Sequence, residues 1–196
     1  MIDNSTIRVL AVPNLQGARF TFELENSQVD WIESANSLQQ QVDILQREYS
    51  GQQLLIGSSF GGLASWRFTA EQSPTELKGL ILLDVLPNLD AFPKHRQFTF
   101  GLLTRLPESI AQSMYHFYRT VQKNPPVDVL PVLERVRSIR CHFPDQNFHV
   151  PTLVISSNIH FHNEWEILSD GHSLLTTQRK TDCDIQIRQW VQHTFH

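Results

Sequence analysis

The chain has few of the features that mark secreted or membrane-spanning proteins. Its 196 residues include two cysteines, far apart at Cys141 and Cys183, which argues against a disulfide framework. No apolar run approaches the roughly 20 residues that cross a bilayer, and the polar first residues, Met1 to Ser5, lack the order of a signal peptide. We therefore expect a cytoplasmic protein without a membrane span.

Clusters of like charge are also lacking. Charged residues make up 18% of the chain, and the formal net charge of −4 is spread along the sequence. Nucleic-acid surfaces normally show clustered Lys and Arg, so no nucleic-acid partner is expected. His160 and His162 are two residues apart, a spacing that would place both on one side of a strand as metal ligands. No Asp or Cys cluster lies near them in the sequence. We expect no metal ion and no organic cofactor.

Short apolar runs alternate with longer amphipathic stretches, which is the pattern of a mostly parallel central sheet with flanking helices. Strands are predicted at residues 7–12, 29–32, 54–56, 80–83, 150–155 and 165–168. Helices are predicted from Ser37, with Gln40 as its capping partner, over residues 63–69 and over residues 181–195. The sequence thus predicts one α/β domain over residues 1–196.

The pattern changes between Asp84 and Val150, where several short helices are predicted. One has an apolar stripe at helical spacing, formed by Ile110, Met114, Phe117 and Val121. We predict a helical lid inserted into the sheet domain at about residues 91–148. Its basic residues either form a solvated face or meet an acidic carrier protein or a negatively charged substrate: Lys94, His95, Arg96, Arg105, Arg119 and Lys123.

The most informative motif is Gly57-Ser58-Ser59-Phe60-Gly61, which matches the G-x-S-x-G pattern. It directly follows a predicted strand and precedes a predicted helix. A sharp turn of this kind lifts the serine hydroxyl off the sheet, and the helix N-terminus supplies positive potential for an oxyanion. A Gly/Ser-rich turn without chemistry gives the same pattern by chance, but the flanking elements and the doubled glycine favour Ser59 as a nucleophile.

With this motif the chain resembles the α/β-hydrolase superfamily. The resemblance extends over nearly the whole length of the chain. Residues 150–155 are similar to the strand that leads to the family's usual acid, and Asp170-Gly171-His172-Ser173 is similar to the segment with the catalytic histidine. The family's first two strands have no counterpart here, so an N-terminally trimmed form of the fold is implied. The resemblance implies a superfamily and not a substrate.

The resemblance implies His172 as the base that takes the proton of Ser59, because it keeps the chain order serine, acid, histidine. His160 and His162 are the alternatives.

The acid is less clearly marked. The family's usual position after Ile155 holds Ser156-Ser157-Asn158. Some relatives place the acid one strand earlier, where Asp84 follows the strand at 80–83, and an acid there would orient the histidine ring. A strand-end aspartate that caps a loop is an equally good interpretation of Asp84, and Glu164 and Asp90 remain alternatives.

The last strand raises a question about His172. Only about eight residues separate Ile155 from the strand near Trp165, whereas a parallel crossover normally needs a dozen or more. The last strand is then either displaced or antiparallel, and in the second case His172 would lie at the wrong edge of the sheet.

The expected oxyanion hole has two backbone donors. One is the N–H of Phe60, and the other comes from the loop Asn14-Leu15-Gln16, with the N–H of Leu15 as the main candidate. A backbone role of this loop is favoured over a side-chain role of Asn14, and an ordinary Pro-Asn turn is the alternative.

Together these residues predict a serine hydrolase that acts through an acyl-enzyme. The aromatic-rich lid favours a hydrophobic acyl group, so a carboxylesterase or an acyl-thioesterase is expected. The partner would be a small-molecule acyl substrate, free or bound to a carrier. The alternatives are a noncatalytic relative that binds a ligand or partner, and a cyclase or lyase that reuses the pocket.

Overall fold

The computed structural model describes residues 6–14, 17, 19–85, 94–121, 149–156, 166–167 and 177–195. The chain divides into two compact units, one formed by residues 1–86 and 144–196 and the other by residues 87–143. The first unit contains the sheet, and the described residues of the second form two helices. The second unit overlaps the predicted lid, residues 91–148; its function as a lid stays a prediction.

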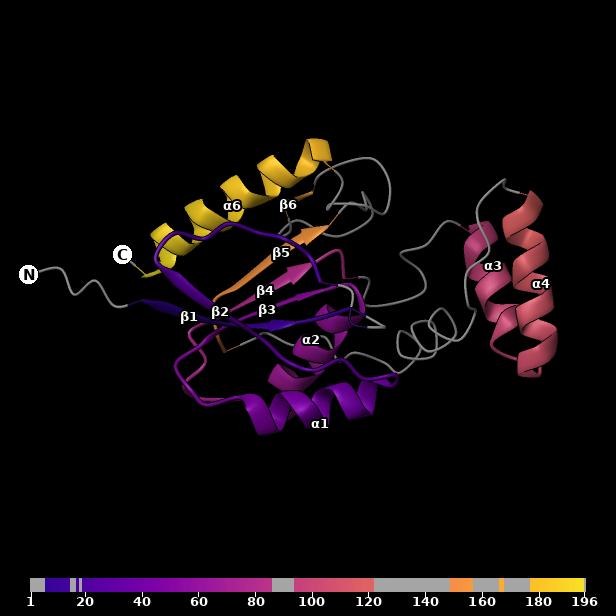
Figure 1. Cartoon of the computed structure of the whole chain (residues 1–196), viewed down its shortest axis with the longest axis horizontal. Coiled ribbons are helices and arrows are strands. Elements are labelled where there is room, and N and C mark those ends of the chain that lie inside the picture. Colours follow the sequence, from indigo (N-terminus) through magenta and orange to yellow (C-terminus); the bar gives the residue numbers. More distant parts are fainter. Residues whose placement is uncertain are drawn as a thin grey trace, which may run out of the picture. The chain divides into compact units, whose positions relative to one another are not determined.

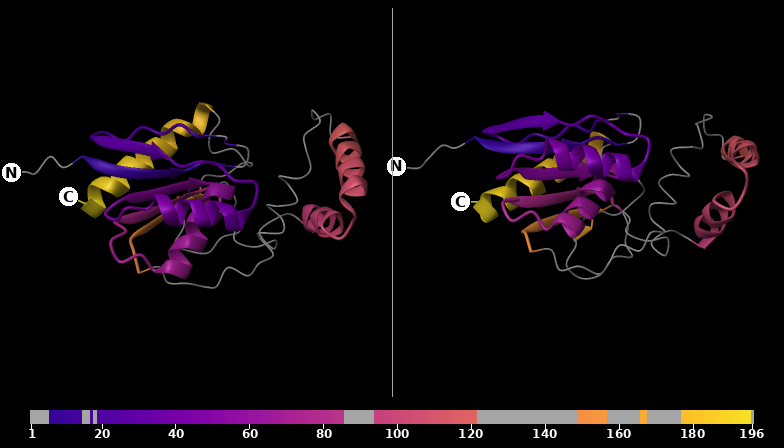
Figure 2. Two further views of the ribbon diagram at one scale, coloured as in Figure 1. Left: turned by 60° about the horizontal axis from the view of Figure 1, so that its bottom comes forward. Right: turned by 90° about the horizontal axis from the view of Figure 1, so that it is seen from below.

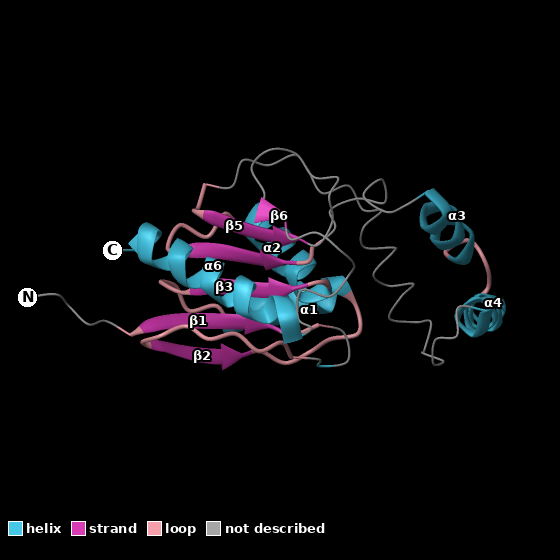
Figure 3. Ribbon diagram, turned by 90° about the horizontal axis from the view of Figure 1, so that it is seen from above, coloured by secondary structure: helices cyan, strands magenta, loops and turns pink. Residues whose placement is uncertain are grey.

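The first unit is built around a parallel sheet in which the described residues form six strands (Figure 3). The strand order is β2-β1-β3-β4-β5-β6, and every one of these neighbouring pairs is parallel. The strands are β1 (Ile7–Val12), β2 (Ser27–Trp31), β3 (Leu54–Ser58), β4 (Gly79–Leu83), β5 (Thr152–Ser156) and β6 (Glu166–Ile167). The predicted α/β class with a mostly parallel sheet is confirmed.

Helices cover both faces of this sheet (Figures 1 and 2). The helices α1 (Leu38–Glu48) and α2 (Phe60–Gln72) lie on one face, and α6 (Thr177–Phe195) lies on the other. Every residue of β3 and β4 is buried, because central parallel strands are covered on both sides and therefore read as continuous apolar runs. The apolar side chains of α6 join the core: Cys183, Ile187 and Val191.

The start of α1 was predicted correctly from the capping residue Ser37. The Ser37 side chain accepts a hydrogen bond from the Gln40 N–H at 3.3 Å, as the predicted cap requires. The fully buried Gln41 then fixes the loop after β2, because its side chain accepts from the Ala35 N–H at 2.8 Å and donates to the Glu33 carbonyl at 2.9 Å. In contrast, α6 begins at Thr177, four residues before the predicted start.

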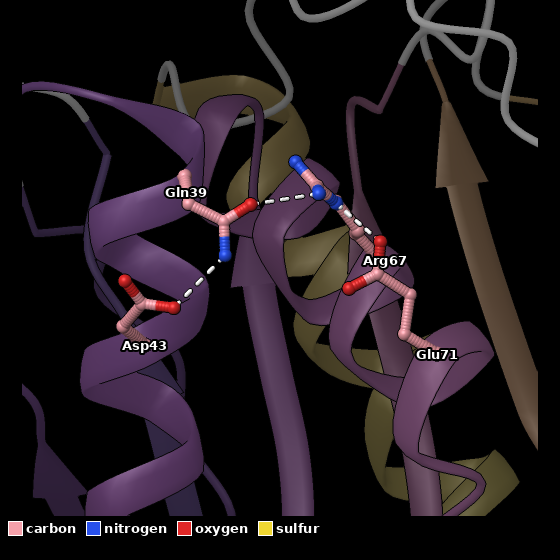
Figure 4. A network of polar contacts seen from close by, with 4 residues as sticks. All are labelled: Gln39, Asp43, Arg67 and Glu71. Atoms are coloured by element: carbon pink, nitrogen blue, oxygen red, sulfur yellow. Dashed lines mark hydrogen bonds and ion pairs between the residues drawn. The ribbon is translucent and has the colours of Figure 1, made fainter.

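A chain of polar contacts joins α1 and α2 on their outer side (Figure 4). Arg67 pairs with Glu71 at 2.6 Å and donates to the Gln39 side chain at 2.7 Å. Gln39 in turn donates to Asp43 at 2.9 Å. These side chains are partly exposed, and exposed ion pairs contribute only about 0–1 kcal/mol each, so the buried apolar core dominates the stability of this layer.

The direction of the last strand corrects one of the sequence expectations. β6 pairs with β5 in parallel, with Ile155 opposite Glu166 and Ser156 opposite Ile167, so the antiparallel alternative is wrong. A parallel crossover must carry the chain back along its partner strand. Within the described residues, β6 pairs with the last two residues of β5. The carboxyl end of β6 therefore lies at the same edge as those of β3 and β4.

The second unit contains α3 (Lys94–Leu103) and α4 (Glu108–Val121). The apolar stripe predicted from the sequence lies on α4, and its members are exposed: Ile110, Met114, Phe117 and Val121. The buried residues of the unit include Leu103 of α3 and Ala111 and Tyr115 of α4. The helix is therefore where the periodicity places it, but the most apolar stripe is not the face that is buried.

None of the helices in the described part of the chain is long and apolar enough to cross a membrane.

Burial raises the pKa of the Cys183 thiol to about 12, and the negative charge of the neighbouring Asp184 adds to the effect. Thiols react as thiolates, so we expect Cys183 to resist thiol reagents at pH 8 in the folded protein. In a Cys141→Ser variant, Ellman's reagent should titrate no thiol before denaturation and one thiol afterwards. Rapid titration of the folded variant would show that α6 does not shield this side chain.

Candidate active site

Ser59 lies alone between β3 and α2, in the conformation expected of a nucleophile elbow. Its φ and ψ are 53° and −113°, a positive φ that is uncommon for a residue with a side chain. The Ser59 N–H donates to the Leu83 carbonyl at 2.8 Å, and the Ser59 carbonyl accepts from the Leu63 N–H at 3.0 Å. The turn is thus held between the neighbouring strand and the first turn of its own helix.

The three glycines around Ser59 are required by close backbone approaches. A Cβ atom at Gly57 would lie 2.6 Å from the Gly61 carbonyl oxygen. One at Gly61 would collide with the Val12 carbonyl oxygen and lie 2.5 Å from that of Pro13, and one at Gly62 would lie 2.9 Å from the Gly57 carbonyl oxygen. The glycines therefore let α2 approach both β3 and the end of β1, which a chance Gly/Ser turn would not require.

Replacing Gly61 with alanine is expected to destabilise the protein, because the new Cβ meets rigid backbone oxygens. Overpacking of this kind costs about 1–3 kcal/mol, measurable as a lower midpoint of urea unfolding. Gly101→Ala in α3 is the matched control, since helix propensity alone makes this change neutral or stabilising. Equal stability of the two variants would contradict the close approach of α2 to β1.

The Ser59 hydroxyl is buried and makes no hydrogen bond to any residue that the structure describes. Ser59 is only 5% exposed. It stands at the N-cap of α2, yet its side chain makes no capping hydrogen bond, although serine at this position normally accepts one. Buried polar atoms without partners are rare in folded proteins and call for an explanation. A hydroxyl held away from local hydrogen bonds is available to a general base.

Asp84 lies beside Ser59 at the carboxyl edge of the sheet. β3 and β4 pair with Ser58 opposite Leu83, so Ser59 and Asp84 are the next residues of two neighbouring strands. Asp84 is 6% exposed and has a φ of 53°. Its N–H donates to the Ile155 carbonyl at 2.7 Å, which fixes its backbone between β4 and β5. The structure therefore brings the predicted nucleophile and acid to adjacent places.

The expected oxyanion donor, the Phe60 N–H, lies in the first turn of α2, where the helix dipole favours negative charge. It donates to the side-chain oxygen of Asn14 at 3.3 Å. Asn14 follows β1, which pairs with β3 so that Val12 lies opposite Gly57. The Asn14 carbonyl accepts from the Gly17 N–H at 3.2 Å, which shapes this loop. The contact of the Asn14 side chain with this N–H was not predicted from the sequence.

No family model and no curated protein matches the chain. Solved structures do match. The NocB thioesterase domain, in covalent complex with a fluorophosphonate nocardicin G analogue, has a TM-score of 0.59 at 15% identity and covers 96% of both chains. Human thioesterase 2 has a TM-score of 0.56 at 14% identity and covers 97% of this chain and 98% of its own. A putative epoxide hydrolase from Pseudomonas aeruginosa has a TM-score of 0.58 at 11% identity, with coverages of 97% and 90%.

The chain has the α/β-hydrolase fold. Identities of 11–15% show the fold alone, and proteins of one fold perform different reactions. The residues at the carboxyl edge of the sheet must therefore carry the functional argument.

Within this α/β-hydrolase fold, the described residues bring together four of the predicted site residues: Asn14, Ser59, Phe60 and Asp84. The other predicted residues and alternatives lie outside the described residues: Leu15, His172, His160, His162, Glu164 and Asp90. Among the described residues, no three His, Cys, Asp or Glu side chains are grouped so as to hold a metal ion.

Proposed function

We propose that this α/β-hydrolase-fold protein is a serine hydrolase that cleaves a carboxylic ester or thioester through an acyl-enzyme on Ser59. The observation that carries the proposal is the Ser59 hydroxyl itself, which is buried and unbonded among the described residues in a strained turn required by three glycines. Nucleophilic serines of this fold occupy the same kind of turn.

In the proposed reaction, His172 removes the proton of Ser59 while the serine oxygen forms a bond to the acyl carbon. The N–H groups of Phe60 and Leu15 hold the oxyanion, and Asp84 orients His172 and stabilises its charged form. His172 then gives the proton to the leaving alcohol or thiol. Water, activated by the same histidine, cleaves the acyl-enzyme and restores Ser59.

A hydrophobic acyl group fits the composition of the chain best. The second unit carries exposed apolar side chains on α3 and on α4, among them Phe98 and Phe117. Exposed apolar surface of this kind is typical of ligand or partner sites. The substrate would be a small acyl compound, free or bound to a carrier. A thioester is favoured over an epoxide by the NocB thioesterase domain, a neighbour of the same fold that forms a covalent complex with a fluorophosphonate nocardicin G analogue.

A fluorophosphonate probe tests the proposal. We expect one phosphonyl group per chain, located by mass spectrometry on the peptide that contains Ser59. Ser59→Ala should abolish labelling, whereas the control Ser58→Ala, which removes the neighbouring hydroxyl, should be labelled. Absence of labelling in the wild-type protein, or equal labelling of Ser59→Ala, would contradict a Ser59 nucleophile.

The second candidate function is a noncatalytic relative that binds a ligand or partner at the same site. It is favoured by one observation, since β5 ends at Ser156 and the family's usual acid position holds no carboxylate. This candidate predicts binding of acyl compounds without turnover or labelling.

A cyclase or lyase is distinguished from a hydrolase and from a binding protein by its products from a tethered acyl substrate. In a cyclase an internal nucleophile of the substrate replaces water.

A further inference from the structure

The backbone donor that the proposed reaction needs is already engaged within the protein. The Phe60 N–H donates to the Asn14 side-chain oxygen at 3.3 Å. In the reaction, this N–H must donate to the oxygen of the substrate carbonyl as its negative charge develops. A backbone amide has a single proton, so the Asn14 oxygen stands where the substrate oxygen is expected.

The surroundings keep this contact in place. Gly61 approaches the carbonyl oxygens of Val12 and Pro13 so closely that no Cβ atom fits. Val12 and Pro13, at the end of β1, are therefore seated against the first turn of α2. Because the Asn14 carbonyl also accepts from the Gly17 N–H, the loop retains a backbone contact of its own when the Asn14 side chain is changed.

We propose that the Asn14 side chain competes with the substrate carbonyl for the Phe60 N–H. The inference rests on the proposed function and extends it, because it assigns the Asn14 side chain a role opposite to that of an oxyanion donor. An acyl group enters the oxyanion hole only when the Asn14 oxygen leaves it.

The length of the contact sets the size of the effect. At 3.3 Å it lies just beyond the usual N–H···O range of about 2.7–3.2 Å, so it is a weak bond that a substrate can displace. Hydrogen bonds to an oxyanion are roughly twice as strong as those to a neutral amide. The Phe60–Asn14 bond is broken both in the substrate complex and in the transition state, so displacing it costs the same free energy in each. Asn14 should therefore raise KM and lower kcat/KM by the same factor, and leave kcat nearly unchanged.

The test compares Asn14 variants with the wild-type protein by two measurements. One is the rate constant of fluorophosphonate labelling at Ser59, and the other is the pair KM and kcat for a nitrophenyl ester. Removing the competitor in Asn14→Ala should accelerate labelling about three- to tenfold, the range expected for a neutral hydrogen bond, and should lower KM with kcat nearly unchanged. Asn14→Gly, which suits a turn equally well, should act in the same direction. Asn14→Asp should slow labelling about tenfold or more, because a carboxylate accepts more strongly at a helix N-terminus.

The exposed Asn36 supplies the matched control: Asn36→Ala should be labelled at the wild-type rate. A structural role of Asn14 would slow all its variants alike, so opposite shifts for alanine and aspartate support the competition. Slower labelling of both Asn14→Ala and Asn14→Gly would make the side chain a helper of the reaction and overturn the inference, as would unchanged rates. If the wild-type protein is not labelled at all, the proposed function fails, and this inference fails with it.

Discussion

Ser59→Ala is expected to lower kcat for ester or thioester hydrolysis by about 10⁴- to 10⁶-fold, as loss of a catalytic serine does in other enzymes. Without the hydroxyl oxygen, no acyl-enzyme can form. The Phe60 N–H remains in place, so a small residual rate above that of buffer is expected from the oxyanion hole. Steady-state kinetics with a nitrophenyl acyl ester measure the loss.

The effect should lie in kcat and not in folding or binding. Ser59 makes no side-chain hydrogen bond within the described residues, so its replacement leaves the unfolding midpoint close to the wild-type value. Ser58→Ala controls for the loss of a hydroxyl one residue away and should retain most of the activity. Turnover by Ser59→Ala within tenfold of the wild-type rate would assign the chemistry to another residue.

Asp84→Asn is expected to reduce kcat by about 10⁴-fold, the effect of the same change in a known catalytic triad. An amide in place of the carboxylate holds the histidine ring in the wrong tautomer and does not stabilise its positive charge. The fold should survive, because asparagine has nearly the same shape and tolerates the positive φ at this position. The Asp84 N–H bond to Ile155 involves only backbone atoms and is unaffected.

A second buried aspartate provides the control for this experiment. Asp184 of α6 is 6% exposed, as Asp84 is, and its carboxylate accepts from the Glu23 N–H at 3.3 Å. Asp184→Asn removes a buried charge that contacts the segment between β1 and β2, so it should change stability but leave kcat within about twofold of the wild-type value. Near-normal turnover of Asp84→Asn would transfer the acid role to Glu164 or leave the site without an acid.

The parts of the fold that follow from local sequence were predictable. Continuous apolar runs identify β3 and β4, because a strand buried on both faces has no polar side. The cap at Ser37 follows from a side chain that satisfies an N–H of its own helix. The elbow at Ser59 is recognisable because its glycines stand at fixed spacings around the serine, between a strand and a helix, although the contacts of Gly61 with Val12 and Pro13 join distant segments.

Features that depend on distant segments were not predictable. The parallel direction of β6 is set by its pairing with β5, and the short spacing along the chain left both directions open. The contact between Asn14 and Phe60 joins residues 46 positions apart and exists only because β1 and β3 are neighbours in the sheet. The exposure of Phe117 and the rest of the α4 stripe depends on what packs beside the helix and not on its period.

A crystal structure of the fluorophosphonate-treated protein tests the central claim most directly, through the position of the phosphonyl oxygen. We predict phosphorus bonded to the Ser59 oxygen and the phosphonyl oxygen about 2.7–3.1 Å from the Phe60 nitrogen. We further predict the Asn14 side chain turned away and a nitrogen of His172 within hydrogen-bonding reach of Ser59. An adduct on another residue, or a phosphonyl oxygen directed away from Phe60 with no imidazole nearby, would contradict the account.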